Sequence, residues 1–170
     1  MQEQQQHFEQ LQEWEKIAKA LGFSTQMYRT EAPLNGIVLH IILAEDQAKR
    51  SSGINILYIP SEEGKSLHSV SLVQLFAAVP FKVEQNTQNS MIDFLYQLNN
   101  QIPVGHFSIG ETGAPYYRYV LAMPKNQSLD LDYLRQLILL IQHQIDRTFP
   151  LLEAVSKGRL TPVEALSKLS

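Results

Sequence analysis

Residues 104–123, VGHFSIGETGAPYYRYVLAM, hold two runs of β-forming residues on either side of a turn. The runs 104–109 and 116–123 are separated by residues 110–115, where two glycines and a proline are typical of a tight connection. Because side chains alternate along a strand, the second run divides into two faces. One face would hold Tyr117, Tyr119 and Leu121, and the other Tyr116, Arg118 and Val120. This stretch predicts an antiparallel hairpin that packs through one face and leaves the other for a partner.

Upstream of the hairpin, the sequence predicts three or four more strands, at residues 25–31, 37–43, 54–59 and 70–79. The run 37–43 is apolar on both faces except for His40, a pattern typical of a largely buried strand. The run 70–79 is compatible with a helix as well, but its alternating Ser, Val and Phe favour a long strand. Short turns between neighbouring runs predict antiparallel pairing.

Apolar residues at helical spacing predict two helices before the hairpin. The first covers residues 8–21, whereas the Gln-rich residues 1–7 are expected to fray. The second begins at Asn89 or Ser90, which are both good N-caps, and Pro103 stops it.

Two more helices follow the hairpin. A long apolar stripe begins at Asp130, whose carboxylate suits a helix N-terminus, and Pro150 predicts a kink or break within it. Residues 161–164, TPVE, combine a capping Thr, a first-turn Pro and a Glu that can reach back, which predicts a short last helix. We therefore expect one α+β domain over residues 1–170, with an antiparallel sheet of five to six strands and helices packed on it. The predicted order is helix, three or four strands, helix, two strands, helix, helix.

Composition and charge exclude several classes of function. The chain has 170 residues, of which 44% are hydrophobic and 18% charged, as is typical of a globular protein. A net charge of -3 argues against a nucleic-acid partner, because such proteins normally carry a surplus of Lys and Arg. The absence of cysteine rules out disulfides and thiolate chemistry and is compatible with a reducing cytoplasm. The sequence shows no signal peptide and no apolar run long enough to cross a membrane, so we expect a cytoplasmic protein.

Candidate catalytic and metal-binding residues are scattered along the sequence rather than grouped. The five histidines are His7, His40, His68, His106 and His143. They fall on separate predicted elements, without the short spacings that zinc sites show. Acidic pairs such as Glu62 and Glu63 lie in predicted turns, where burial cannot tune their pKa values. The GETG sequence at 110–113 matches the short loop of KH domains but would join strands here rather than helices. We therefore predict no catalytic, cofactor or metal site.

A set of short features in the second half of the chain is specific in combination. The features are Leu98–Asn100 followed by Val104–Phe107, then Tyr117–Tyr119, Phe149–Pro150 and Gly158–Leu166. Together with the element order, they resemble the YbjN-like proteins, which share the type III secretion chaperone-like fold. The resemblance covers about the last 70 residues, and the first half matches by element order only. It implies a small cytoplasmic α+β domain, often dimeric, with regulatory or chaperone-like roles and no catalytic residues to carry over.

Surplus apolar area on the sheet is the main functional signal. Several strands carry apolar or aromatic residues on both faces, and a small domain that exposes such a face usually binds a partner or a second copy of itself. We expect a homodimer and a protein partner, which docks either on the sheet face through Tyr116, Arg118, Val120, His40 and Ile42 or on the terminal helices. A second helix layer, built from the terminal helices, would cover that face instead.

Two further functions stay open from the sequence. A small-ligand-binding protein or an enzyme could form a pocket between sheet and helices, with His40, Arg118 and Tyr119 as its polar groups. The second open function is weak nucleic-acid association through the tyrosine-rich residues 116–119, although the RRM signature is absent. The leading prediction is a non-catalytic protein-interaction or chaperone-like domain without a cofactor, a nucleic acid or a membrane as partner.

Overall fold

The described residues form one six-stranded antiparallel sheet with the strand order β1-β2-β3-β4-β6-β5. The structure is a computed structural model, and it describes residues 2–30, 36–45, 51–59, 69–125 and 127–169. The strands are β1 (Ser24–Arg29), β2 (Ile37–Ile42), β3 (Gly53–Tyr58), β4 (Val70–Ala78), β5 (His106–Ile109) and β6 (Pro115–Pro124). The predicted α+β class and number of strands are confirmed, and the ambiguous run 70–79 is a strand.

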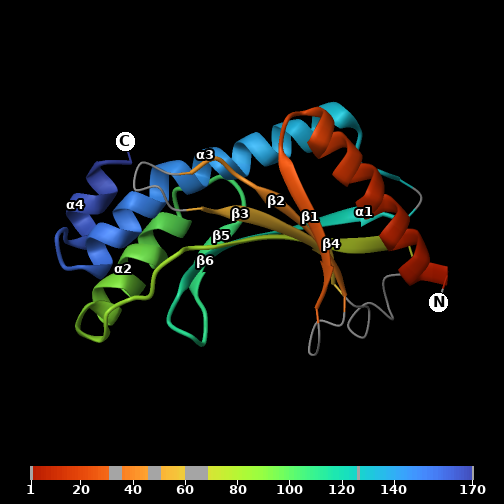
Figure 1. Cartoon of the computed structure of the whole chain (residues 1–170). Helices are drawn as coiled ribbons and strands as arrows, with labels where there is room; N and C mark the ends of the chain where they lie inside the picture. The colour runs from red at the N-terminus through yellow and green to blue at the C-terminus, as the bar shows by residue number, and fades with distance from the viewer. Residues whose placement is uncertain (1, 31–35, 46–50, 60–68, 126, 170) are drawn as a thin grey trace.

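In this part of the chain, four α-helices lie on one face of the sheet (Figure 1). They are α1 (Gln2–Ala20), α2 (Gln88–Asn99), α3 (Leu131–Ser156) and α4 (Pro162–Ser167), and the short 3-10 helix η2 (Gln85–Thr87) precedes α2. α1 lies over β1 and β2, whereas α2 contacts β5 and packs against α3 and α4. None of these helices covers the opposite face, so the alternative of a second helix layer does not hold for the described elements.

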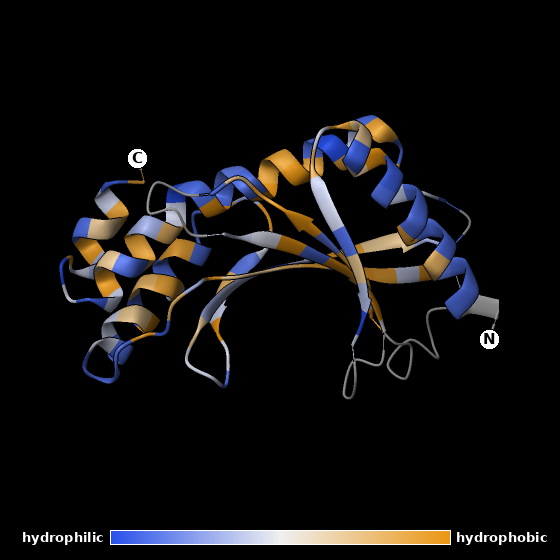
Figure 2. Ribbon diagram, in the orientation of Figure 1, coloured by the Kyte–Doolittle hydropathy of each residue, from blue (hydrophilic) through white to orange (hydrophobic). Residues whose placement is uncertain are grey.

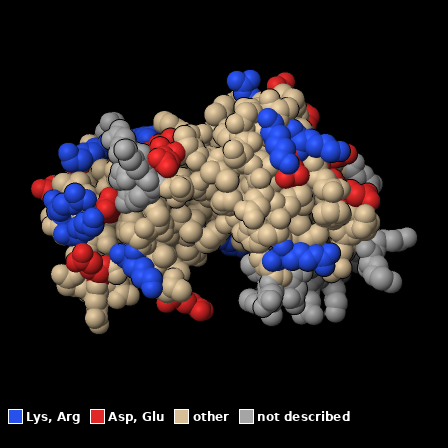
Figure 3. All heavy atoms as spheres, in the orientation of Figure 1, with Lys and Arg blue, Asp and Glu red and all other residues tan. Residues whose placement is uncertain are grey.

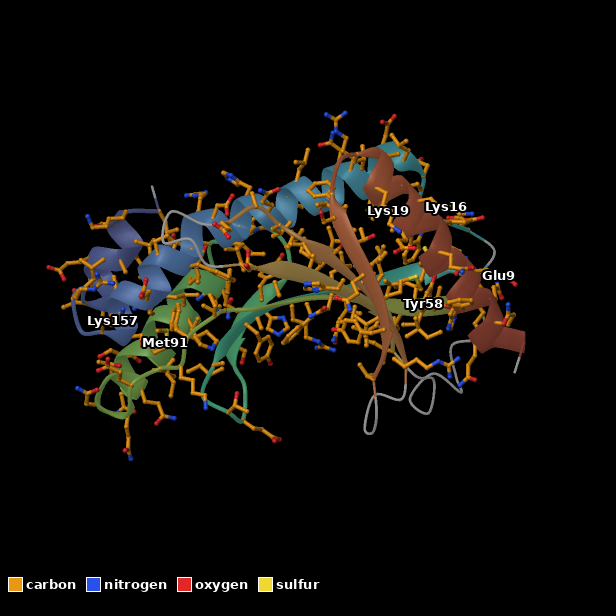
Figure 4. All side chains as sticks on the ribbon, viewed as in Figure 1. Glu9, Lys16, Lys19, Tyr58, Met91 and Lys157 are labelled. Atoms are coloured by element: carbon orange, nitrogen blue, oxygen red, sulfur yellow. The ribbon has the colours of Figure 1, made fainter. Side chains whose placement is uncertain are left out.

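The face under the helices holds the hydrophobic core. The most deeply buried strand side chains on this face, each at most 1% exposed, are Leu39, Ile41, Ile54, Ile56, Val73, Leu75, Ala77, Phe107 and Tyr117. α1 docks through Trp14, which is fully buried and stacks on Tyr58 of β3 with 5.8 Å between ring centroids. Figure 2 shows apolar residues along the central strands and on parts of the helices, and Figure 4 shows Tyr58 close to α1. Burial of these side chains is the main term that stabilises the fold.

The first helix is longer than predicted. We expected residues 1–7 to fray, but α1 already begins at Gln2. Gln6 Nε2 donates to the Lys125 carbonyl at 2.9 Å, and the His7 ring stacks on Tyr58 at 3.7 Å between centroids. These contacts with distant parts of the chain hold the first turns, which the Gln-rich sequence does not predict by itself.

The start of α2 is also set by a distant contact. The prediction that Asn89 or Ser90 caps this helix is wrong, because the helix begins at Gln88 and Thr87 is its N-cap. The Thr87 hydroxyl makes no capping bond; it lies 2.6 Å from the carbonyl of Ser156 and 3.1 Å from that of Glu84. The C-terminal end of α3 therefore positions the beginning of α2.

α3 is continuous from Leu131 to Ser156, so of the kink or break predicted at Pro150, the break does not occur. Asp130 caps the helix as predicted, with its Oδ1 accepting from the Tyr133 N–H at 2.7 Å. Pro150 is exposed, so water can satisfy the carbonyl that loses its helical partner. The predicted capping box of α4 is confirmed between Thr161 and Glu164. No helix within the described ranges is long and apolar enough to cross a bilayer.

Candidate functional site

The face of the sheet opposite the helices, here called the open face, carries the predicted partner-binding residues. Alternation along β2 and β6 turns one set of side chains into the core and the other set away from the helices. The second set includes all five predicted residues: His40, Ile42, Tyr116, Arg118 and Val120. Figure 3 shows that the molecule is hollowed on its lower side, where Figure 1 places this face.

One row of side chains crosses the open face from edge to edge. The strand pairings place its members side by side in the order Gln26, His40, Asn55, Phe76, Arg118 and His106. His40 and Arg118 lie three strands apart in this row, roughly 14 Å at normal strand spacing. The predicted residues therefore form two groups, and residues of β3 and β4 lie between them.

The first group is organised around His40. Its Nδ1 lies 2.8 Å from Asn55 Oδ1, and the Tyr28 hydroxyl donates to the same oxygen at 3.0 Å. A Cβ on Gly53 would overlap the imidazole, so the ring packs against the backbone of β3. Partial burial raises the pKa of Tyr28. His40 is thus a half-buried histidine with a hydrogen-bond partner on the neighbouring strand.

The second group is organised around Arg118. Its Nε donates to Gln74 Oε1 at 2.6 Å, and no described residue accepts from its two Nη groups. None of the six strands contains Asp or Glu, so the open face offers this half-buried guanidinium no carboxylate from a strand. Aromatic rings lie beside it: Phe76 is its cross-strand neighbour, and the Phe76 and Tyr116 rings are 5.1 Å apart. This group is an arginine beside aromatic rings and one glutamine, with no described acceptor for its Nη groups.

His106, which faces Arg118 from β5, has a perturbed protonation equilibrium. Burial lowers its pKa, and the positive charge of Arg118 lowers it further. Its ring meets that of Tyr116 edge-on, with 6.4 Å between centroids. The neutral imidazole is therefore favoured, and Arg118 carries the charge at this end of the row.

Apolar exposure on the open face is concentrated at its ends. At one end, Tyr28 and Ile42 are 40% and 39% exposed, and at the other end Phe76, Tyr116 and Val120 are half-buried. Val38 and Leu57, on the strands between these two ends, are at most 3% exposed. The face is thus apolar but not uniformly accessible. A partner would find its accessible contacts beside His40 and beside Arg118.

The polar groups expected for a small-ligand pocket do not come together. His40 and Arg118 project from the open face, but Tyr119 lies on the covered face, packed against the core. Burial raises the pKa of Tyr119, and the nearby Tyr133 adds to the shift. The sheet itself separates the three residues, so they cannot line one pocket.

A groove that the sequence did not predict lies between α2 and the edge strand β5. Its volume is about 600 Å³, and its walls are Gln88, Ile92, Leu95, Tyr96 and Asn99 of α2 and residues 107–111. Ile92 and Tyr96 are 51% and 73% exposed, and Glu111 is the one charged residue in the lining. The helical spacing of 92 and 96 was readable from the sequence, but their position next to β5 depends on the fold.

The remaining histidines lie apart from one another. His7 is bound to the sheet under α1, His143 is exposed on α3, and His68 falls outside the described residues. Across the described ranges, no three His, Asp or Glu side chains gather as metal ligands would.

No family model matches the chain, and no curated protein matches it. The resemblance to YbjN-like proteins therefore stays a prediction that rests on the residues that carry it.

Proposed function

We propose that this chain is a non-catalytic protein-binding domain whose docking surface is the open face. The observation that carries the proposal is Arg118, which lies half-buried beside Phe76, with its Nε bound to Gln74 and both Nη groups unused by described residues. Desolvating such a charge is costly unless a carboxylate or a similar acceptor completes it. The partner that fits is a protein segment with apolar side chains and at least one carboxylate.

The charge distribution favours a different protein over a second copy at this surface. Two open faces packed together would bring two Arg118 side chains into one interface, with no Asp or Glu on any strand to pair with them. Like charges without partners at an interface oppose association. The homodimer predicted from the sequence therefore uses another surface in this proposal.

The cytoplasmic location stays a prediction, which cell fractionation tests.

The hollow shape supports the same reading. A concave sheet face surrounds a convex segment better than a flat one does, and apolar groups at both ends of the row give that segment two contact areas. Arg118 would then fix the orientation of the segment by a bidentate bond to its carboxylate. A surface of this kind is compatible with the regulatory or chaperone-like roles that the YbjN-like resemblance implies.

Site-specific photo-crosslinking tests the proposal. A benzophenone amino acid replaces Ile42 on the open face or, as a control, Leu139 on α3, two positions that are 39% and 41% exposed. We expect crosslinks from position 42 to one acid-bearing partner segment, and their loss when Arg118→Glu is added. Equal crosslinking from both positions, no crosslinking from 42, or insensitivity to Arg118→Glu would each overturn the proposal.

A further inference from the structure

The outer edge of β5 is partly closed by a side chain of α2. Asn99 Nδ2 donates to the Phe107 carbonyl at 2.9 Å, and the Phe107 N–H donates to Asn99 Oδ1 at 2.8 Å. The carboxamide thus makes the two bonds that a neighbouring strand would make at this residue. Edge strands are commonly protected in such ways, because open backbone groups recruit other strands.

Two residues further along the same edge, the backbone of Ile109 is open. In an antiparallel pair, alternate residues direct their backbone groups toward the partner strand and away from it. Phe107 bonds outward to Asn99, so Ile109 also points outward, and no described residue bonds to its N–H or carbonyl. Pro115, which lies opposite Ile109 on β6, makes no backbone bond to it. Proline has no N–H, and the Pro115 carbonyl accepts from the Val79 N–H, on the side of β6 away from β5.

The open backbone of Ile109 faces the groove beside α2. Ile92 and Tyr96, one helical turn apart, form an exposed apolar wall there, and Glu111 places a negative charge near the end of β5. An unpaired backbone donor and acceptor next to an apolar wall is the arrangement that accepts an extended peptide, which adds to a sheet edge and inserts alternate side chains.

We propose that this groove binds a short extended segment of a partner protein with an apolar residue and a basic residue. The segment pairs its backbone with Ile109, places its apolar side chain against Ile92 and Tyr96, and directs its basic side chain to Glu111. A second copy of this chain fits less well, because joining two β5 strands would also need the Phe107 groups that Asn99 holds. This site is separate from the proposed docking of an acidic segment at Arg118.

A phage-displayed library of random heptapeptides, selected on the whole chain, tests the inference. The counter-selection uses the double variant Ile92→Ser with Tyr96→Ala; both residues are exposed, so the fold should survive. We expect enriched peptides with alternating apolar residues and a Lys or Arg. A library that yields nothing, or peptides retained by the double variant, would overturn the inference.

The best peptide, made synthetically, then reports the binding mode. N-methylation of the backbone nitrogen that faces Ile109 should weaken binding at least tenfold, whereas methylation of the next nitrogen should leave binding within a factor of two. Amide NMR signals of Ile109 and Gly110 should shift on titration into the unmodified protein. Shifts confined to other elements, or equal effects of the two methylations, would contradict an added strand.

Three variants separate this site from its alternatives. Val163→Ser on α4, at a residue 70% exposed and outside the groove lining, should bind the peptide as the unmodified chain does. Arg118→Glu should also bind it unchanged, so the two proposals can fail independently. Sedimentation of the unmodified chain and of Ile92→Asp tests whether a second copy occupies the groove. A dimer that Ile92→Asp dissociates, and that persists when the peptide is added, would show that it does and that the inference is wrong.

Discussion

The side chain of Tyr117 fills the space beside Gly105, and its hydroxyl donates to the carbonyl of Val104 at 2.8 Å. Gly105 has φ +68°, and a Cβ there would overlap the phenol ring. The turn before β5 thus depends on a residue without a side chain, because a core tyrosine occupies the place of the methyl group. Since β5 borders the groove and carries His106, this contact positions parts of both proposed sites.

Gly105→Ala is therefore expected to destabilise the protein by about 2–4 kcal/mol, the sum of an unfavourable backbone conformation and steric overlap. The matched control is Gly113→Ala, where φ is +80° but no atom lies within 4 Å of the added Cβ. We expect only about 1 kcal/mol there. Urea unfolding measures both, and equal losses would show that the Tyr117 contact is unimportant.

Asn99→Asp tests the closure of the β5 edge. The carboxylate still accepts from the Phe107 N–H but cannot donate to the Phe107 carbonyl, so two oxygens face each other. The expected loss of stability is about 1–3 kcal/mol, the usual cost of an unmatched, partly buried polar group. Asn100→Asp is the control, because the neighbouring residue is exposed. If thermal denaturation gives the same midpoint for both variants, the Asn99 bonds do not stabilise the edge.

The protonation of His106 is expected to depend on Arg118. Arg118→Met removes the positive charge, so the pKa of His106 should rise, but burial should keep it below the ordinary value of 6.5. NMR titration of the imidazole measures the shift, with Arg29→Met at the far edge of the sheet as the control. An unchanged His106 pKa in Arg118→Met would show that the two side chains do not interact.

The same shift predicts how stability varies with pH. Because the pKa of His106 is lower in the folded chain than the unfolded value of 6.5, the unfolded chain binds more protons below about pH 6.5. The His106 contribution is therefore fully present above pH 6.5 and is lost as pH falls through the folded pKa. Replacing His106 by Gln should flatten this part of the stability profile. A slope that persists in the variant would assign it to another group.

Local sequence signals predicted much of the fold but not its long-range contacts. Asp130 and Thr161 were readable as helix starts, because capping involves residues three positions apart. The start of α2 was misplaced because the Thr87 hydroxyl bonds to Ser156, which is 69 residues away. Pro150 does not break α3, because the residue lies on the solvent side of the helix.

The candidate site also combines residues that local sequence signals predict with residues that only the fold brings together. Alternation along β6 was sufficient to place Tyr116, Arg118 and Val120 on one face. It did not reveal Asn55 or Phe76, since those residues join the site only through strand order and register. The helical spacing of Ile92 and Tyr96 did not reveal the groove beside β5, because the groove exists only where α2 lies against the sheet edge.

The affinity between the purified chain and the segment crosslinked at position 42 tests the central claim most directly. Arg118→Glu should weaken binding at least tenfold, Arg29→Glu should not, and reversing the charge of the partner's carboxylate to Lys should restore binding to Arg118→Glu. Equal dissociation constants for the unmodified chain and Arg118→Glu would contradict the claim that this arginine recognises the partner.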